Sequence, residues 1–289
     1  MVYTSSMPVS APAVEQYNSL VVRACADPNS GIVSAVLFGS AATGSYSPEI
    51  SDVDLLIVLD DRATTQDRCR VRDTISELEE RSGARKQYPY RRGALDAIAD
   101  RITANVRSFF VCTRADLLSG DPARILDITA MQARFVDRVA IPSIIGSGVT
   151  IWGEDLLRKV PLLPIRRFDV AKAFFSFFNQ MSFALVAYPL VPGATKYAME
   201  ALKRSIHNCY YCYHCRPAQL SEEVAFFQKR LGPNVSLAQL MKLRTAYQRS
   251  FGFTLRCFPT LARLHLATAW DNQFPRNPRA PETVRSNGC

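Results

Sequence analysis

The chain has only three histidines among its 289 residues, and none is close in sequence to Asp52 and Asp54, the two neighbouring carboxylates discussed below. A histidine-based nucleophilic mechanism therefore has no support. The chain also lacks a Gly-x-Gly-x-x-Gly fingerprint and a Walker phosphate loop. Its formal net charge is +9, but no dense run of lysine and arginine occurs. Such a diffuse positive field favours nucleotides as partners over a dedicated nucleic-acid surface.

The N-terminal segment lacks the basic start and the apolar core of a signal peptide. Eight cysteines without such a signal indicate a reducing compartment, and we expect a cytoplasmic protein. An uncharged stretch at residues 173–195 is interrupted by Ser176, Asn179 and Gln180, whereas a membrane span needs about 20 mainly apolar residues. We therefore expect no membrane partner and predict that residues 168–188 form a buried core helix.

One window near the N-terminus, at residues 37–58, reads LFGSAATGSYSPEISDVDLLIV. The apolar, β-branched run at residues 31–38 predicts a buried strand, which Gly39 and Ser40 end in a short helical turn. Glycine lets the backbone approach a phosphate without a Cβ in the way. The Ser40 hydroxyl and the amides of the turn can donate to phosphate oxygens. The first half of the window thus predicts a phosphate-binding turn.

The second half of the window carries Asp52 and Asp54 at the start of a strand predicted over residues 53–59. Alternate strand residues point to the same side, so the two carboxylates project together. They would repel each other without a divalent cation, and Mg²⁺ is typically held by a few carboxylates plus substrate phosphates. An Asp-x-Asp at a strand start is also common as a solvated pair. Its position after Gly-Ser, between apolar strands, favours a metal site for phosphoryl transfer.

The window resembles the signature of the DNA polymerase β-type nucleotidyltransferase superfamily, in which Gly-Ser is followed after about ten residues by Asp-x-Asp. It is similar in particular to stand-alone bacterial adenylyltransferase-like proteins, including the aminoglycoside nucleotidyltransferases. The resemblance implies that Gly39 and Ser40 bind the triphosphate of ATP. We add Ser51, the residue before Asp52, as a further candidate for binding the nucleotide. It also implies that Asp52 and Asp54 hold Mg²⁺ and are the catalytic carboxylates.

The superfamily usually adds a third carboxylate on a later strand. The strand predicted here at residues 104–113 contains neither aspartate nor glutamate. Asp96 and Asp100 precede it and Asp116 follows it, and none stands at the expected place. Two functions therefore stay open: a magnesium-dependent nucleotidyltransferase, and a catalytically silent nucleotide-binding or partner-binding module of the same fold.

The order of elements predicts an α/β nucleotidyltransferase domain with a mixed sheet, followed by an all-α helical domain. We place the boundaries at 1–13 for a flexible N-terminus, 14–159 for the first domain, 160–271 for the helical domain and 272–289 for a disordered tail. Such an enzyme would transfer AMP from ATP to an acceptor hydroxyl and release pyrophosphate. A small-molecule acceptor fits two domains best, and a protein or RNA acceptor stays open.

The helical half is predicted to begin with the helix at 168–188 and to contain four more. Its second helix carries Lys196 and Lys203, which are seven residues apart and share a face with Glu200. By the family resemblance, a lysine from this region reaches the triphosphate. Pairing with Glu200 would instead make the face an ordinary charged surface, which we weigh more heavily. The other predicted helices cover residues 194–213, 221–231, 236–251 and 259–270.

Cysteines and histidines crowd the segment from His207 to Cys215, which reads HNCYYCYHC. Structural zinc sites typically use two widely separated ligand pairs. On a helix, Cys209 and Cys212 share a face, which suits core packing because free cysteine is among the most buried residue types. We favour core packing, with metal binding as the alternative.

Overall fold

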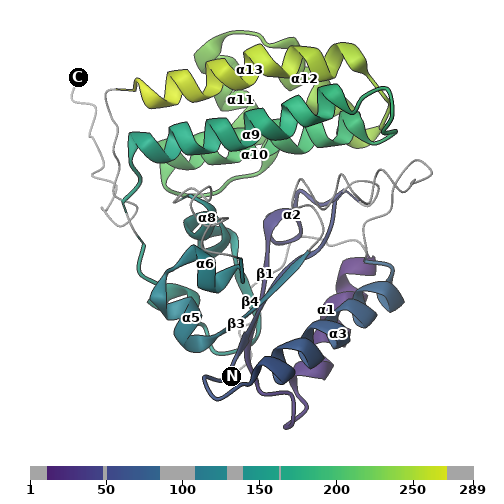
Figure 1. Cartoon of the computed structure of the whole chain (residues 1–289), viewed down its shortest axis with the longest axis vertical. Helices are drawn as coiled ribbons and strands as arrows, with labels where there is room; N and C mark the ends of the chain where they lie inside the picture. Colours follow the sequence, from purple (N-terminus) through teal and green to yellow (C-terminus); the bar gives the residue numbers. More distant parts are fainter. Residues whose placement is uncertain (1–11, 48–50, 85–107, 129–138, 163, 272–289) are drawn as a thin grey trace, which may run out of the picture.

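Four strands form one mixed sheet in the order β3-β2-β1-β4 (Figure 1). Strand β1 (Ile32–Phe38) runs antiparallel to β2 (Asp54–Leu59) and to β4 (Val149–Gly153), whereas β3 (Phe109–Thr113) is parallel to β2. The predicted mixed sheet is confirmed. The computed structural model describes residues 12–47, 51–84, 108–128, 139–162 and 164–271.

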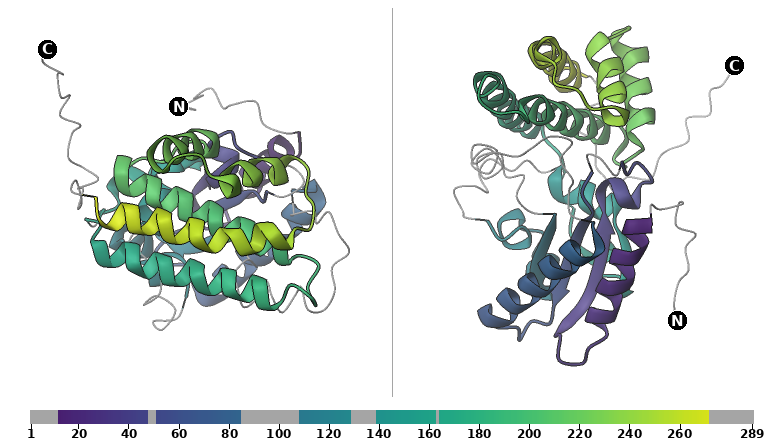
Figure 2. Two further views of the ribbon diagram at one scale, coloured as in Figure 1. Left: turned by 90° about the horizontal axis from the view of Figure 1, so that it is seen from above. Right: turned by 90° about the vertical axis from the view of Figure 1, so that its right-hand side faces the viewer.

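Helices cover both faces of the sheet (Figures 1 and 2). Alternate residues of β2 belong to two different cores, since Leu55 packs with the residues of α1 and α3, and Leu56 packs with those of α5, α6 and α8. This period of two is what a strand buried on both faces requires. These helices are α1 (Pro12–Cys25), α3 (Thr65–Ser82), α5 (Arg114–Ser119), α6 (Pro122–Ile125) and α8 (Ala140–Ser147).

The second half of the described chain is helical and lies beyond one end of the sheet (Figure 1). A short 3-10 turn, η1 (Leu157–Lys159), precedes it. Its helices enclose a separate apolar core, with α10 at the centre. The predicted fold class is therefore confirmed, whereas the domain boundaries stay a prediction. The helices are α9 (Arg167–Val186), α10 (Ala194–His214), α11 (Leu220–Leu231), α12 (Val235–Thr245) and α13 (Phe251–Ala269).

The last helix differs most from its predicted bounds. We expected a helix from Pro259, but α13 already begins at Phe251, and α12 ends at Thr245. Ser250 caps the new start, because its hydroxyl accepts a hydrogen bond from the Phe253 amide at 3.2 Å. Pro259 therefore lies inside the helix. Two candidate carboxylates, Asp96 and Asp100, lie outside the described residues, as do residues 1–11 and the tail at 272–289.

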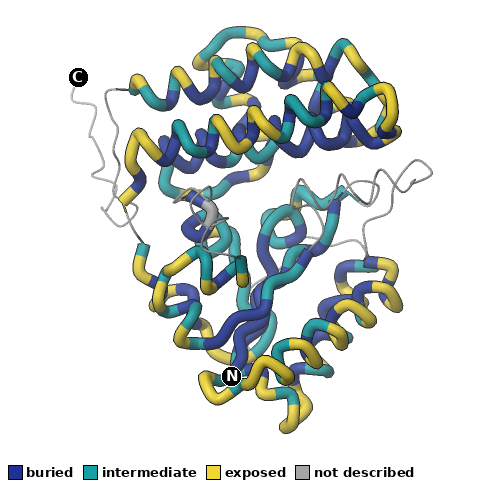
Figure 3. The backbone as a smooth tube through the Cα atoms, viewed as in Figure 1, coloured by how far each residue is buried: buried dark blue, intermediate teal, exposed yellow. Residues whose placement is uncertain are grey.

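Helix α9 is buried on one side only, which corrects the prediction of a core helix (Figure 3). Phe177 and Met181 face the helical core, whereas Phe168 and Phe175 are exposed by 72% and 62%. The phenylalanines exceed what one packing face can hold, so several remain on the outer surface. Among the described helices, none is long and apolar enough to cross a membrane.

His265 on α13 is a buried histidine with a consequence for pH stability. Burial lowers its pKa from 6.5 to about 4, although its Nδ1 lies 3.2 Å from the Val170 carbonyl oxygen. Because the unfolded chain binds this proton more readily, His265 supports folding above pH 6.5 and stops doing so as the pH falls towards 4. We expect the free energy of unfolding to fall by about 2 kcal/mol from pH 7 to pH 5.

Chemical denaturation at both pH values checks this expectation. The same measurement on His265→Gln removes the titrating group and keeps one N–H donor for the carbonyl. The variant should therefore lose about 2 kcal/mol less than the wild type over this pH range. Equal losses in the two proteins would contradict the assignment to His265.

Candidate active site

The end of β1 and the start of β2, the two central strands, lie side by side at one end of the sheet. Phe38 is paired with Asp54 in the antiparallel register, and the single turn α2 (Gly39–Ala42) follows at once. Gly39 has a φ of +68°, and a Cβ placed on it would lie 3.2 Å from Cγ of Asp54 and would overlap Oδ2. The space that glycine leaves open is therefore occupied by the Asp54 carboxylate, so the predicted phosphate turn and the predicted metal ligand are in direct contact.

Asp52 lies at the same end of the sheet, and one fully buried valine separates it from Asp54 in the sequence. Val53 is 0% exposed, while Asp52 and Asp54 are half-buried, as strand alternation predicts. Burial and the nearby charge of Asp52 together raise the pKa of the Tyr46 phenol. Tyr46 belongs to the loop that follows α2, so Asp52 faces this loop.

Reciprocal hydrogen bonds fix the serines that flank the loop. The Ser51 amide donates to the Ser47 carbonyl oxygen at 2.8 Å, and the Ser47 amide donates to Ser51 Oγ at 3.0 Å. The Ser45 amide donates to the Ser40 carbonyl oxygen at 2.9 Å. The Gly39 amide donates to Ser147 Oγ of α8 at 3.4 Å. Ser51 thus shapes the loop, and its role towards a nucleotide stays a prediction.

The glycine turn and the two aspartates at this end of the sheet belong to a region that matches a known family. Residues 19–92, which contain the glycine turn and both aspartates, match the family described as nucleotidyltransferase domain. The chain contains a nucleotidyltransferase domain. The predicted membership of the nucleotidyltransferase superfamily is confirmed.

The fold has a parallel among solved structures. It is similar to the spectinomycin adenyltransferase of Enterococcus faecialis, solved with ATP and spectinomycin, with a TM-score of 0.50. The sequences are 9% identical, and the match covers 89% of this chain and 99% of the other. At this identity the likeness concerns the fold, including the helices that follow the nucleotidyltransferase domain. No curated protein matches the sequence.

The two candidate lysines lie on α10, beyond the nucleotidyltransferase domain. Lys203 Nζ forms an ion pair with Glu200 Oε2 at 2.7 Å, which supports the interpretation of a paired charged face. Lys196 is only 3% exposed and Glu200 only 5%. The face is therefore buried, in contrast to the solvated surface that we expected. Triphosphate binding by Lys196 and Lys203 stays a prediction.

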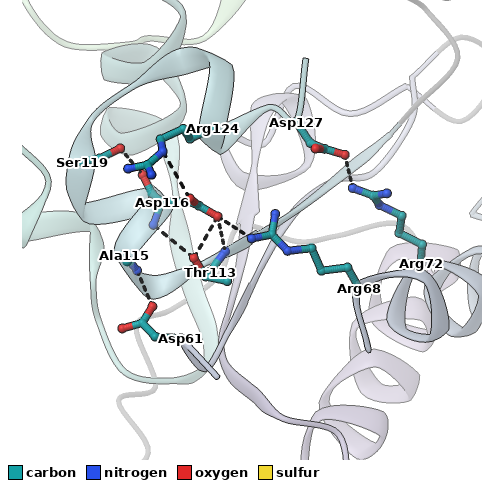
Figure 4. A network of polar contacts seen from close by, with 9 residues as sticks. All are labelled: Asp61, Arg68, Arg72, Thr113, Ala115, Asp116, Ser119, Arg124 and Asp127. Carbon is teal, nitrogen blue, oxygen red and sulfur yellow. Dashed lines mark hydrogen bonds and ion pairs between the residues drawn. The ribbon is translucent and has the colours of Figure 1, made fainter. Parts of the chain in front are cut away.

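Asp116 lies at the far end of β3 from Asp54, so it cannot complete the site, and Figure 4 shows its contacts with Thr113, Arg68 and Arg124. Strands β2 and β3 are parallel, so Asp54 stands where β2 begins, and Asp116 follows the end of β3. Asp116 Oδ2 accepts hydrogen bonds from Thr113 and from Arg68 Nη2, the latter at 2.7 Å. Burial raises the Asp116 pKa, but these bonds outweigh it and hold the pKa below its usual value. Asp116 is thus a structural carboxylate that caps α5.

Replacing Asp116 with alanine should lower the free energy of unfolding by about 2–3 kcal/mol, because it removes a helix cap and leaves the partly buried Arg68 unpaired. Since the Asp116 pKa is lowered, this stabilisation exists at neutral pH and is lost as the pH falls through that pKa. Denaturant unfolding measures the loss. Asp67→Ala is a control, because Asp67 caps α3 in the same way from an exposed position, and should cost less.

Sequence reasoning missed Glu79, a buried carboxylate close to the start of β3. Glu79 Oε1 accepts a hydrogen bond from Ser108 Oγ at 2.5 Å, and the Ser108 carbonyl oxygen accepts from the Leu55 amide at 2.9 Å. A signal existed in the sequence. Val71, Ile75 and Glu79 are spaced by four residues, which places the glutamate on the buried face of α3.

The cysteine-rich segment of α10 is packed into the protein interior. Cys209 and Cys212 are 0% and 1% exposed, in agreement with the core packing that we favoured. His207 Nδ1 lies 2.5 Å from Glu223 Oε2 of α11. Within the part of the chain that the structure describes, no group of three or more histidine, cysteine, aspartate or glutamate side chains could hold a metal ion.

Proposed function

We propose that this chain transfers a nucleoside monophosphate, AMP from ATP, to an acceptor hydroxyl and releases pyrophosphate. The observation that carries the proposal is the contact between Gly39 and the Asp54 carboxylate. Nucleotidyl transfer needs a phosphate and a carboxylate-bound cation at one place, and this contact brings a phosphate-type turn to a carboxylate. The nucleotidyltransferase domain and a fold shared with an adenyltransferase solved with ATP support the same class of reaction.

Asp52 and Asp54 fit a magnesium site by their chemistry. Mg²⁺ is usually bound through one or two carboxylates and substrate phosphates, and it keeps several waters. Two carboxylates on either side of a buried valine match this donor set, although the described strand β3 adds no third one. Bound Mg²⁺ would neutralise negative charge on the phosphates.

The remaining roles fall to groups of the chain itself. Gly39 and Ser40 would bind the triphosphate through backbone and hydroxyl donors, and Ser51, Lys196 and Lys203 are candidates for further phosphate contacts. In this proposal the acceptor hydroxyl is held in line with the α-phosphorus. Its oxygen forms a bond to phosphorus as the bond to the departing pyrophosphate breaks, and the hydroxyl proton passes to solvent water. Positioning and charge neutralisation would supply most of the rate acceleration.

A small molecule with free hydroxyl groups is the acceptor that we propose. The structural neighbour was solved with spectinomycin, and its helices match those that follow the sheet here. An RNA acceptor has less support, because the sequence shows neither a compact basic stretch nor an aromatic platform. Spectinomycin and related hydroxyl-bearing antibiotics are therefore the first acceptors to assay.

The test is an incubation of the purified chain with ATP labelled at the α-phosphate, Mg²⁺ and a panel of acceptors. We expect label in the acceptor and one pyrophosphate for each label transferred, both dependent on Mg²⁺. Binding of ATP without pyrophosphate release for any acceptor would instead support the silent nucleotide-binding module. A chain that binds no nucleotide would contradict both of these functions and would leave a partner-binding module of the same fold.

A further inference from the structure

Arg244 at the end of α12 joins the helical region to the loop between α2 and β2. Its Nη2 donates to the Ser45 carbonyl oxygen at 2.9 Å, and its own carbonyl oxygen accepts a hydrogen bond from Ser47 Oγ at 3.1 Å. Ser45 and Ser47 lie 199 and 197 residues before Arg244 in the sequence. One residue of the helical region thus holds the loop at two points.

Further hydrogen bonds connect this loop to both halves of the candidate site, the Gly39–Ser40 turn and the segment that begins at Ser51. The Ser45 amide is bonded to the Ser40 carbonyl oxygen, and Ser47 is bonded reciprocally to Ser51, which directly precedes Asp52. Ser51 is only 2% exposed. A continuous chain of hydrogen bonds therefore runs from the phosphate-type turn through Arg244 to Ser51, the residue before Asp52.

Arg244 is a buried charged residue, so the protein needs hydrogen-bond partners for its guanidinium. The residue is only 8% exposed. Burial lowers the pKa of its guanidinium, and the charge of Glu200 on α10 acts in the opposite direction. A buried arginine is unfavourable unless its donors are satisfied. The Ser45 carbonyl oxygen satisfies one of them, so the loop and the guanidinium depend on each other.

We infer that Arg244 is a positioning residue of the nucleotide site. It holds Ser45 directly, and it holds Ser51 through Ser47, so that the Gly39–Ser40 turn and Asp52 keep their relative placement. Through Arg244, the helical region then contributes to the geometry of the site. This inference rests on the proposed function for its effect on nucleotide binding. The fixing of the loop itself does not depend on that function.

Two measurements on the full-length Arg244→Gln variant test the inference. Hydrogen–deuterium exchange of a peptide covering residues 40–52 reports on the loop, and titration calorimetry reports the Kd for Mg·ATP. We expect exchange at least about tenfold faster and a Kd raised about ten- to hundredfold, since a displacement of about 1 Å is enough for such losses. In the transfer assay the KM for ATP should rise more than kcat falls.

Two further variants and one control variant distinguish a loss of positioning from a simple folding defect. Arg244→Lys keeps a charge opposite Glu200 and should give intermediate effects. Ser47→Ala leaves Arg244 in place and removes one bond to it, and should change both readouts in the same direction by about threefold. Arg256→Gln is the matched control, because Arg256 is exposed on α13 and contacts Gln239 at 2.8 Å. It should match the wild type in exchange and in Kd.

The outcomes separate this inference from the proposed function. Exchange and Kd unchanged in Arg244→Gln and Ser47→Ala would overturn it. Faster exchange with an unchanged Kd would overturn the link to the nucleotide. If the wild type binds no Mg·ATP, the proposed function fails together with that link, and the exchange rates alone decide whether Arg244 fixes the loop.

Discussion

Replacing Asp54 with asparagine should lower the rate of nucleotidyl transfer at least about a thousandfold, which corresponds to about 4 kcal/mol of transition-state stabilisation. Asparagine has almost the same shape, but it lacks the negative charge that a magnesium ion needs. Asp54 is half-buried and lies at the start of β2, so the fold should tolerate the change. Pyrophosphate release at saturating Mg·ATP is the measurement, and Asp52→Asn should give a loss in the same direction.

Asp60 provides the matched control for these variants. It follows the other end of β2 and accepts a hydrogen bond from the Arg62 amide at 2.9 Å. Asp60→Asn should change the rate by less than about twofold, as expected for a substitution away from the site. Magnesium-dependent transfer that survives in both Asp52→Asn and Asp54→Asn would show that the metal ligands are assigned wrongly.

Elements bounded by strong local signals were predictable from the sequence. The strand predicted at residues 31–38 is found at residues 32–38, because its β-branched run is bounded by Gly31 and Gly39. Helix α3 carries comparable signals at both of its ends. Its capping box of Thr64 and Asp67 and its left-handed Gly83 are signals of a helix start and stop.

Contacts between distant parts of the chain carry no such local signal. Arg244 occurs in a short helix whose pattern gives no reason to single out one arginine, and its partners lie nearly two hundred residues away. Asp116 follows β3, but only the parallel pairing of β3 with β2 shows that it lies at the far end from Asp54. The sequence therefore predicts the motif of the candidate site, whereas its support from the helices follows only from the fold.

The contact between Gly39 and Asp54 also could not be predicted from the sequence. We expected the missing Cβ to make room for a phosphate, whereas the structure places the Asp54 carboxylate against this glycine. A glycine and an aspartate fifteen positions apart meet because β1 and β2 pair with Phe38 opposite Asp54. The glycine thus has a second task, which is to admit the carboxylate, and that task can be tested separately from backbone strain.

Gly39→Ala should reduce transfer at least about a hundredfold, because the new methyl group would overlap Asp54 Oδ2 and displace the carboxylate. The positive φ of +68° should in addition cost about 1–2 kcal/mol of stability. Gly31 separates the two effects. It has a φ of +66° at the other end of β1, and a Cβ there would meet nothing within 4 Å.

Gly31→Ala should therefore lose as much stability as Gly39→Ala and keep its activity. Denaturant unfolding and pyrophosphate release, measured on both variants, make the comparison. Combining Gly39→Ala with Asp54→Asn gives a further check. If the methyl group acts through the carboxylate, it should add little to the loss that Asp54→Asn already causes. Fully additive losses would mean that Gly39 acts on the phosphates directly, as the sequence alone suggested.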